Sequence, residues 1–341
     1  MSLAVVILAA GQGTRMNSRT QKILHEVGGK PMVKHVFEAA ETIADRPPLL
    51  IVGPGEFGVA ALFGEKAAYV TQPEQLGTGH ATQMAKEALQ GKSDQVLVTY
   101  GDMPLLRGET MRRLAESQAS SGAALALLSV EGPANSPFGR VVRDASGNVQ
   151  EIVEVAEARQ RPDGEEILAI TELNAGVYCF DASWLWQTIP ALPLRQARSG
   201  PEYYLTDLVE MAVKQGKRVA ALTVEDADEC LGAGTRQEMA LVEKAFRRRA
   251  NAYWLARGVT LVDPETVYID QDVNIGQDTV IWPNTFLQGA SVIGEACILG
   301  PNTIIRDAIV GDGCIVEQAV VERASVAPGT RLRPFTLLSE E

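Results

Sequence analysis

Cysteine and histidine are scarce in this sequence, and their spacing argues against a zinc or disulfide framework. The 341 residues include four cysteines and three histidines. No two cysteines form a C-x-x-C pair, and no histidine has metal-ligand spacing with them. We therefore expect four buried thiols in a reducing cytoplasm. They are Cys179, Cys230, Cys297 and Cys314.

The sequence also lacks a long hydrophobic run and an excess of positive charge. Its longest uncharged apolar stretch near the N-terminus, residues 3–10, is far shorter than the roughly 18 residues that a membrane span needs. No basic region precedes it, so we expect neither a signal peptide nor membrane insertion. The net charge of −12 argues against nucleic-acid binding, which depends on a cationic surface. A local cluster of Arg and Lys can still bind a small anion.

Short aliphatic runs alternate with helical patterns over residues 1–230. At about 150 residues per domain the length predicts two domains, of which 1–230 is the first. The predicted strands are Val5–Ala9, Leu49–Val52 and Val96–Thr99, and the predicted helices include Met32–Ala44 and Thr110–Ser120. This alternation predicts an α/β fold with a Rossmann-like, mostly parallel sheet covered on both faces. Ligands of such sheets bind beyond the carboxyl ends of the strands, here in the loops after Ala10 and Tyr100.

A different period begins after residue 258. Residues 231–258 read as a helical connector, and an aliphatic side chain then recurs every six residues. The recurring positions are Ile269, Ile275, Ile281, Leu287, Ile293, Leu299 and Ile305, each preceded two positions earlier by a small or β-branched residue. A period of six is the signature of a parallel β-helix. We expect residues 259–341 to form a short β-helix of hexapeptide repeats, with a one-residue phase slip after Ile305.

The first predicted strand runs into a glycine-containing loop, Leu8-Ala-Ala-Gly-Gln-Gly-Thr-Arg-Met16, which is followed by Lys22. Gly11 and Gly13 let the backbone approach a phosphate closely, so that free N–H groups bind its oxygens. Arg15 and Lys22 add fixed positive charge. The loop is not the Rossmann fingerprint, because Met16 stands at the third glycine position. A plain strand-to-helix turn is the alternative interpretation.

Further segments match the pattern of a known family, in order along the chain. They are residues 72–81, 100–105, 138–144, 152–154, 172–174 and 203–207, and the run 258–264 leads into the hexapeptides. Together with the 8–16 loop and Lys22, they resemble the sugar-1-phosphate nucleotidyltransferases. The similarity is closest to the bifunctional bacterial family of UDP-N-acetylglucosamine pyrophosphorylases/glucosamine-1-phosphate N-acetyltransferases. It covers nearly the whole chain and implies a nucleotidyltransferase domain followed by a left-handed β-helix.

The resemblance implies a Mg²⁺-dependent uridylyl transfer from UTP to N-acetylglucosamine-1-phosphate, giving UDP-N-acetylglucosamine and pyrophosphate. The sugar phosphate attacks the α-phosphorus in line, so positioning and charge neutralisation suffice without a protein nucleophile. Carried over by position, the catalytic residues are Arg15, Lys22 and Asp102, with Asp102 holding Mg²⁺. The nucleotide-binding residues are Leu8, Ala9, Ala10, Gly11, Gly13, Gln72, Gln75, Gly77 and Thr78. The sugar-binding residues are Tyr100, Gly101, Gly139, Glu154, Asn174 and Thr206, the last near the sugar's phosphate.

Several of these side chains have simpler interpretations. Asp102 and Asn174 could end or cap a turn, and Glu154 could lie on a solvated strand. His80, inside the 72–81 segment, is interpreted as a packing or helix-start residue. Two alternative functions remain open: a nucleotidyltransferase for another hexose-1-phosphate or for dTTP, and a weakly active regulatory or binding homologue.

Three departures from the family pattern bear on function. Ala156 stands where the family has a lysine, and Gly234 stands where it has a metal-binding asparagine. One carboxylate with phosphates and water still suits Mg²⁺. The family also continues for more β-helix coils than this sequence has, so we expect no acetyl transfer. The resemblance further implies a homotrimer assembled through the β-helices.

Overall fold

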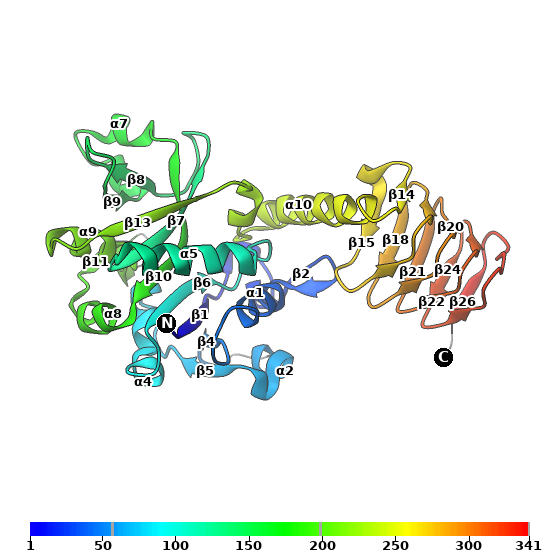
Figure 1. Cartoon of the computed structure of the whole chain (residues 1–341), viewed down its shortest axis with the longest axis horizontal. Helices are drawn as coiled ribbons and strands as arrows, with labels where there is room; N and C mark the ends of the chain where they lie inside the picture. The colour runs from blue at the N-terminus through cyan, green and yellow to red at the C-terminus, as the bar shows by residue number, and fades with distance from the viewer. Residues whose placement is uncertain (56–57, 198–199, 340–341) are drawn as a thin grey trace. The chain divides into compact units, whose positions relative to one another are not determined.

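The computed structural model describes residues 1–55, 58–197 and 200–339, and the chain divides into two compact units (Figure 1). The first unit contains residues 1–25 and 32–238. The second contains residues 26–31 and 239–341.

The first unit is built on a mixed sheet. Its main strands, in spatial order, are β13 (Val219–Val224), β7 (Leu125–Glu131), β10 (Glu172–Asp181), β6 (Gln95–Tyr100), β1 (Leu3–Ala9), β4 (Leu49–Val52) and β5 (Ala68–Thr71). All neighbours pair in parallel except β10, which is antiparallel to β6 and β7. The hairpin β8 (Arg140–Arg143) and β9 (Val149–Val153) extends from β10, and β11 (Leu194–Ala197) pairs with β12 (Gly200–Tyr203). The predicted mostly parallel sheet is confirmed.

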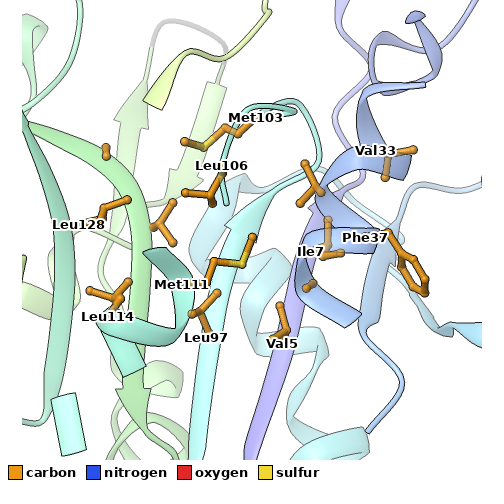
Figure 2. Packing of buried hydrophobic residues seen from close by; sticks show 14 of the residues in the cluster. Val5, Ile7, Val33, Phe37, Leu97, Met103, Leu106, Met111, Leu114 and Leu128 are labelled. Carbon is orange, nitrogen blue, oxygen red and sulfur yellow. The ribbon is translucent and has the colours of Figure 1, made fainter. Parts of the chain in front are cut away.

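Helices cover both faces of this sheet. They are α1 (Met32–Glu41), α2 (Val59–Phe63), α3 (Gly77–Met84), α4 (Lys86–Leu89), α5 (Gly108–Ser121), α6 (Val155–Ala158), α7 (Gly164–Leu168), α8 (Ala182–Thr188) and α9 (Asp207–Lys214). All seven residues of β1 are buried, as expected for a central strand packed on both sides. Figure 2 shows Met111 and Leu114 of α5 beside Leu97 of β6 and Leu128 of β7. The predicted helices at 32–44 and 110–120 are confirmed, with ends shifted by a few residues.

The second unit contains a β-helix of three parallel strand stacks, drawn from yellow to red in Figure 1. One stack is β14 (Thr260–Leu261), β17 (Val280–Ile281), β20 (Ile298–Leu299) and β23 (Ile315–Val316). The second is β15 (Val267–Ile269), β18 (Thr285–Gln288), β21 (Thr303–Arg306), β24 (Val320–Glu322) and β26 (Leu337–Ser339). The third is β16 (Asn274–Ile275), β19 (Val292–Ile293), β22 (Ile309–Val310) and β25 (Ser325–Val326).

The register of these stacks explains the period of six. Ile269 pairs with Leu287 and Leu287 with Ile305, so three hexapeptides complete one coil. All seven recurring aliphatic residues from Ile269 to Ile305 are buried in one core. Ile293 pairs with Val310, one residue short of the earlier spacing. The predicted hexapeptide β-helix and its phase slip are therefore confirmed.

A short hairpin from the N-terminal part of the chain belongs to the second unit. It consists of β2 (Glu26–Val27) and β3 (Lys30–Pro31). The Gly28 N–H donates to Glu243 of helix α10 (Arg236–Leu255), and the Gly28 carbonyl accepts from the Gln271 N–H at 3.0 Å. Gly28 has a φ of 55°, and a Cβ there would collide with the Phe246 ring. Lys30 pairs with Asp272 at 2.8 Å, which gives the hairpin a further contact within the second unit.

All four cysteines are free and buried, in agreement with the sequence. Within the described residues, no helix combines the length and the apolar character that crossing a bilayer requires.

Candidate active site

Two adjoining cavities open at the carboxyl ends of the central strands of the first unit. The first, of about 290 Å³, is lined by Leu8, Ala10, Gly11, Lys22, Ile23, Gln72, Gln75, Gly77, Thr78, Ala81, Tyr100, Asp102 and Glu202. The second, of about 400 Å³, is lined by Arg15, Lys22, Tyr100, Asp102, Met103, Pro137, Phe138, Gly139, Glu154, Asn174, Ala175, Gly176, Cys230, Gly232, Gly234 and Glu238. Lys22, Tyr100 and Asp102 line both cavities and mark their junction.

The loop after β1 brings its two basic residues to this junction. Gly13 adopts a φ of 65°, and a Cβ there would lie 2.4 Å from the Cβ of Lys22. The absent side chain at Gly13 therefore lets the residues around Lys22 fold back against the loop. Arg15 lies in the short 3₁₀ turn Thr14–Met16 and lines the second cavity.

The segment after β5 forms one wall of the first cavity. The Gln75 side-chain amide donates to the Ala10 carbonyl at 2.5 Å, which ties this segment to the loop after β1. Gln72 is buried, and its amide contacts Gly77 and His80. Thr78 accepts a hydrogen bond from the Leu205 N–H at 3.1 Å. These contacts give the wall a defined shape before any ligand binds.

The junction holds an ion pair beside a neutral phenol. Lys22 Nζ lies 2.5 Å from Asp102 Oδ2, and both side chains are more than four-fifths buried. Burial raises the pKa of Tyr100, and the Glu154 and Asp102 carboxylates raise it further. Tyr100 therefore keeps its proton at neutral pH, so the charges at the junction belong to Lys22 and Asp102.

The second cavity has a polar end formed by Glu154 and Asn174. Burial raises the pKa of Glu154, with Glu157 and Asp207 raising it further, because this carboxylate has lost much of its hydration. Asn174 accepts with its Oδ1 from the Gly176 N–H and the Tyr178 hydroxyl, which leaves its Nδ2 for other partners. A desolvated carboxylate beside an amide donor suits a ligand with several hydroxyl groups.

Most of the predicted site residues line these cavities, but four do not. Ala9 is buried inside β1, and the backbone N–H of Gly101 donates to the Leu8 carbonyl at 3.0 Å. Gly13 lines neither cavity, and its role is to let the residues around Lys22 pack against the loop after β1. Thr206 precedes α9 and lines neither cavity. Ala156, the first departure noted in the sequence, is exposed on α6 and also lies outside both linings.

Gly234, the second departure, has a role that the sequence did not indicate. A Cβ at this position would lie 2.6 Å from Arg15 Nη2 and 3.0 Å from Glu238 Oε2. The Gly234 N–H donates to Glu238 at 2.7 Å. The space of the missing side chain is therefore taken by the Arg15 guanidinium, and Glu238 adds a carboxylate that sequence reasoning missed.

Arg140 is a second residue that sequence reasoning missed, although it lies inside the quoted segment 138–144. Its guanidinium is buried and donates to the carbonyls of Phe138, Ala134 and Ser136. These bonds fix the loop whose Pro137, Phe138 and Gly139 line the second cavity. Arg140 itself lines neither cavity. It supports the loop from behind, a role that no ligand-binding motif in the sequence would indicate.

The donor set at the junction suits Mg²⁺ bound together with a phosphate ligand. Among the residues that the structure describes, no three His, Cys, Asp or Glu side chains are grouped to hold a metal by themselves. Asp102 supplies one carboxylate, and Gly234 supplies no side chain. Mg²⁺ typically keeps several waters and uses one or two carboxylates with substrate phosphates. Asp102 therefore fits as the protein ligand of a metal that arrives with a nucleotide.

The fold, the paired cavities and a family match define the class of this protein as a nucleotidyltransferase. Residues 5–171 match the MobA-like NTP transferase domain, and residues 272–307 match the bacterial transferase hexapeptide of six repeats. A solved structure of CMP:2-keto-3-deoxy-manno-octonic acid synthetase complexed with CTP superposes with a TM-score of 0.53. That match covers 73% of this chain and all of the other at 17% identity, and it supports the fold alone.

Comparison with curated proteins then gives the family. The bifunctional protein GlmU of Exiguobacterium sibiricum is 40% identical over all of this chain and 74% of its own length. GlmU of Halalkalibacterium halodurans is 39% identical over 98% of this chain and 74% of its own. The GlmU of Enterococcus faecalis is also 39% identical, over 98% and 71%. The chain belongs to the GlmU family and is a sugar-1-phosphate nucleotidyltransferase.

Proposed function

We propose that this protein transfers a uridylyl group from UTP to N-acetylglucosamine-1-phosphate, releasing pyrophosphate. The observation that carries the proposal is the junction of two cavities at Lys22, Tyr100 and Asp102. Two substrates that react with each other need adjoining sites with charge at the meeting point. One cavity then holds the nucleotide and the other holds the sugar phosphate.

The first cavity is the proposed nucleotide site. Its wall from Gln72 to Thr78 offers amide and backbone groups to a base, while the loop from Ala10 to Gly13 follows the phosphates. Gln75 connects these two parts through its bond to the Ala10 carbonyl. The buried Gln72 side-chain amide can pair with the edge of a pyrimidine base.

The second cavity is the proposed sugar site. Glu154 provides an acceptor, and the Asn174 Nδ2, which has no hydrogen-bond partner among the described residues, provides a donor for sugar hydroxyl or amide groups. A Cβ at Gly139 would lie 3.4 Å from the Glu154 carboxyl, so glycine keeps this end open. Thr206 lies outside the lining, and its place near the sugar phosphate remains a prediction that depends on the resemblance.

The chemistry needs orientation and charge compensation rather than a covalent intermediate. Lys22 and Arg15 bind the triphosphate and offset the charge that develops on the departing pyrophosphate. Tyr100, which lines both cavities, stays protonated and adds no negative charge beside the phosphates. Mg²⁺, held by Asp102 when bound, supplies further charge neutralisation at the phosphates. When the nucleotide enters, Lys22 exchanges Asp102 for phosphate oxygens.

The test is a pyrophosphate-release assay over a matrix of nucleoside triphosphates and sugar-1-phosphates. We expect the highest kcat/KM with UTP and N-acetylglucosamine-1-phosphate. A higher value with dTTP or with another hexose-1-phosphate would support the corresponding alternative activity instead. Higher values with ATP or GTP would contradict the assignment of the first cavity. Turnover close to background with every pair would favour a regulatory or binding role.

We also propose that the protein assembles as a homotrimer through its β-helix. Val292 and Ile309 pair in register on β19 and β22, and their side chains are 43% and 57% exposed. Apolar side chains stacked on a strand face are costly in water and are typical of a contact surface. The resemblance stated above supplies the stoichiometry of three.

Light scattering at micromolar concentration is expected to give the mass of three chains. The double variant V292E/I309E places two charges on the proposed contact and is expected to give the mass of one chain. Leu241, exposed on α10, provides a matched control, because L241E adds charge to the same unit outside the strand stacks. A monomer mass for the unmodified protein would contradict the trimer.

A further inference from the structure

The hydrogen bonds of Gln72 determine which way its side-chain amide faces. Gln72 is 3% exposed and lines the first cavity. Its Nε2 donates to the Gly77 carbonyl at 3.2 Å and lies 3.0 Å from His80 Nδ1. A carbonyl oxygen only accepts, so the amide nitrogen must face Gly77. Both hydrogens of that nitrogen are then used, the second by His80.

This arrangement leaves the amide oxygen for a ligand. Within the described part of the chain, Gln72 Oε1 makes no hydrogen bond, and it is not among the buried atoms that lack a partner. It is therefore open to the cavity that Gln72 lines. An exposed amide oxygen is an acceptor, so it selects ligands that present an N–H group at this point.

His80 takes a defined protonation state through the same contact. Because Gln72 Nε2 donates, His80 Nδ1 must accept, and the imidazole is neutral with its hydrogen on Nε2. The bond to Gly77 is 3.2 Å long, at the weak end of the usual range. His80 is thus the closer of the two acceptors that hold the amide in this orientation.

We propose that His80 is a positioning residue for nucleobase selection, because it orients the Gln72 amide so that Oε1 faces the base. Uracil and thymine carry an N–H at ring position 3, which Oε1 accepts. Cytosine has a bare nitrogen there, and two acceptors would face each other. This inference rests on the proposed function, since it assumes that the first cavity holds the base of the nucleotide. His80 itself touches no substrate in this arrangement.

Removing the acceptor at position 80 should loosen the discrimination between UTP and CTP. In His80→Leu, one hydrogen of the buried Gln72 amide loses its partner, and only the longer 3.2 Å bond to the Gly77 carbonyl still holds Nε2 away from the base. The orientation with Oε1 toward the base is therefore less strongly favoured. In the molecules whose amide does rotate, the nitrogen can donate to N3 of cytosine. We expect the ratio of kcat/KM for UTP to that for CTP to fall about tenfold. In His80→Asn, Oδ1 provides an acceptor near the place of Nδ1, and the ratio should be restored.

The experiment measures both nucleotides with the unmodified protein, His80→Leu and His80→Asn, and checks folding by thermal melting. His80→Ala replaces His80→Leu if leucine is not accommodated, and calorimetric binding of UTP and CTP without sugar phosphate gives a second readout. A purely structural defect would weaken both nucleotides equally and leave their ratio unchanged, which would overturn the inference. If the unmodified protein does not prefer UTP to CTP, the proposed nucleotide site fails instead.

Discussion

Asp102→Asn is expected to lower kcat/KM for nucleotidyl transfer by at least about a hundredfold while leaving the fold intact. Asparagine is nearly isosteric with aspartate, but it lacks the negative charge that holds a divalent cation. The substitution also removes the partner of Lys22, which now lies 2.5 Å from the carboxylate. Steady-state rates measured at several Mg²⁺ concentrations should show both a lower maximum and a higher half-saturating concentration.

Asp94 offers a matched control for this variant. It precedes strand β6, whereas Asp102 follows it, so the same substitution is made at the two ends of one strand. Asp94 accepts from the Ser2 N–H at 2.7 Å, and asparagine retains an acceptor oxygen for this bond. Asp94→Asn should therefore keep its turnover. Equal turnover in Asp102→Asn, or tight binding of Mg²⁺ by that variant without nucleotide, would contradict the role of Asp102.

The second large effect is expected in the β-helix, where Ile305→Ala should lower the free energy of unfolding by about 2–5 kcal/mol. Ile305 is fully buried in β21, which pairs with β18 on one side and β24 on the other. Each coil packs only against its neighbours, so a cavity in a middle coil weakens two interfaces at once. Denaturant unfolding followed by circular dichroism measures the change.

Leu241→Ala is the control for this prediction. Leu241 is 59% exposed on α10, so its truncation leaves no internal cavity and should change the free energy of unfolding by about 0.5 kcal/mol or less. A loss below about 1 kcal/mol for Ile305→Ala would mean that the narrow core collapses around the smaller side chain.

Periodicity made most of the fold predictable. The strand Leu49–Val52 has the same bounds in the sequence prediction and in the structure. The hexapeptide pattern predicted the β-helix because each coil repeats the same inward position. The one-residue phase slip after Ile305 was also visible in the sequence, and in the structure it appears as the pairing of Ile293 with Val310. The antiparallel direction of β10 was not predicted, since a buried strand has the same composition in either direction.

The site was predictable to the extent that local motifs mark it. The loop after β1 and the segments beginning at Gln72 and Tyr100 could be found because contiguous residues form each wall. Glu202 and Glu238 could not, because they reach the cavities from distant parts of the chain. The relation between Gly234 and Arg15 likewise depends on a contact across the chain that no spacing encodes.

The hairpin β2–β3 and the residues that surround it are far apart in the order of synthesis. Residues 26–31 are synthesised early, yet the residues that complete their surroundings, such as Glu243, Phe246 and Asp272, are synthesised late. During translation, Val27 cannot be fully buried and Lys30 cannot pair with Asp272 until the C-terminal third of the chain has been synthesised. A fragment ending near residue 238 would carry the same segment without its partners. The ribosome therefore releases the second unit in two parts, one before and one after most of the first unit.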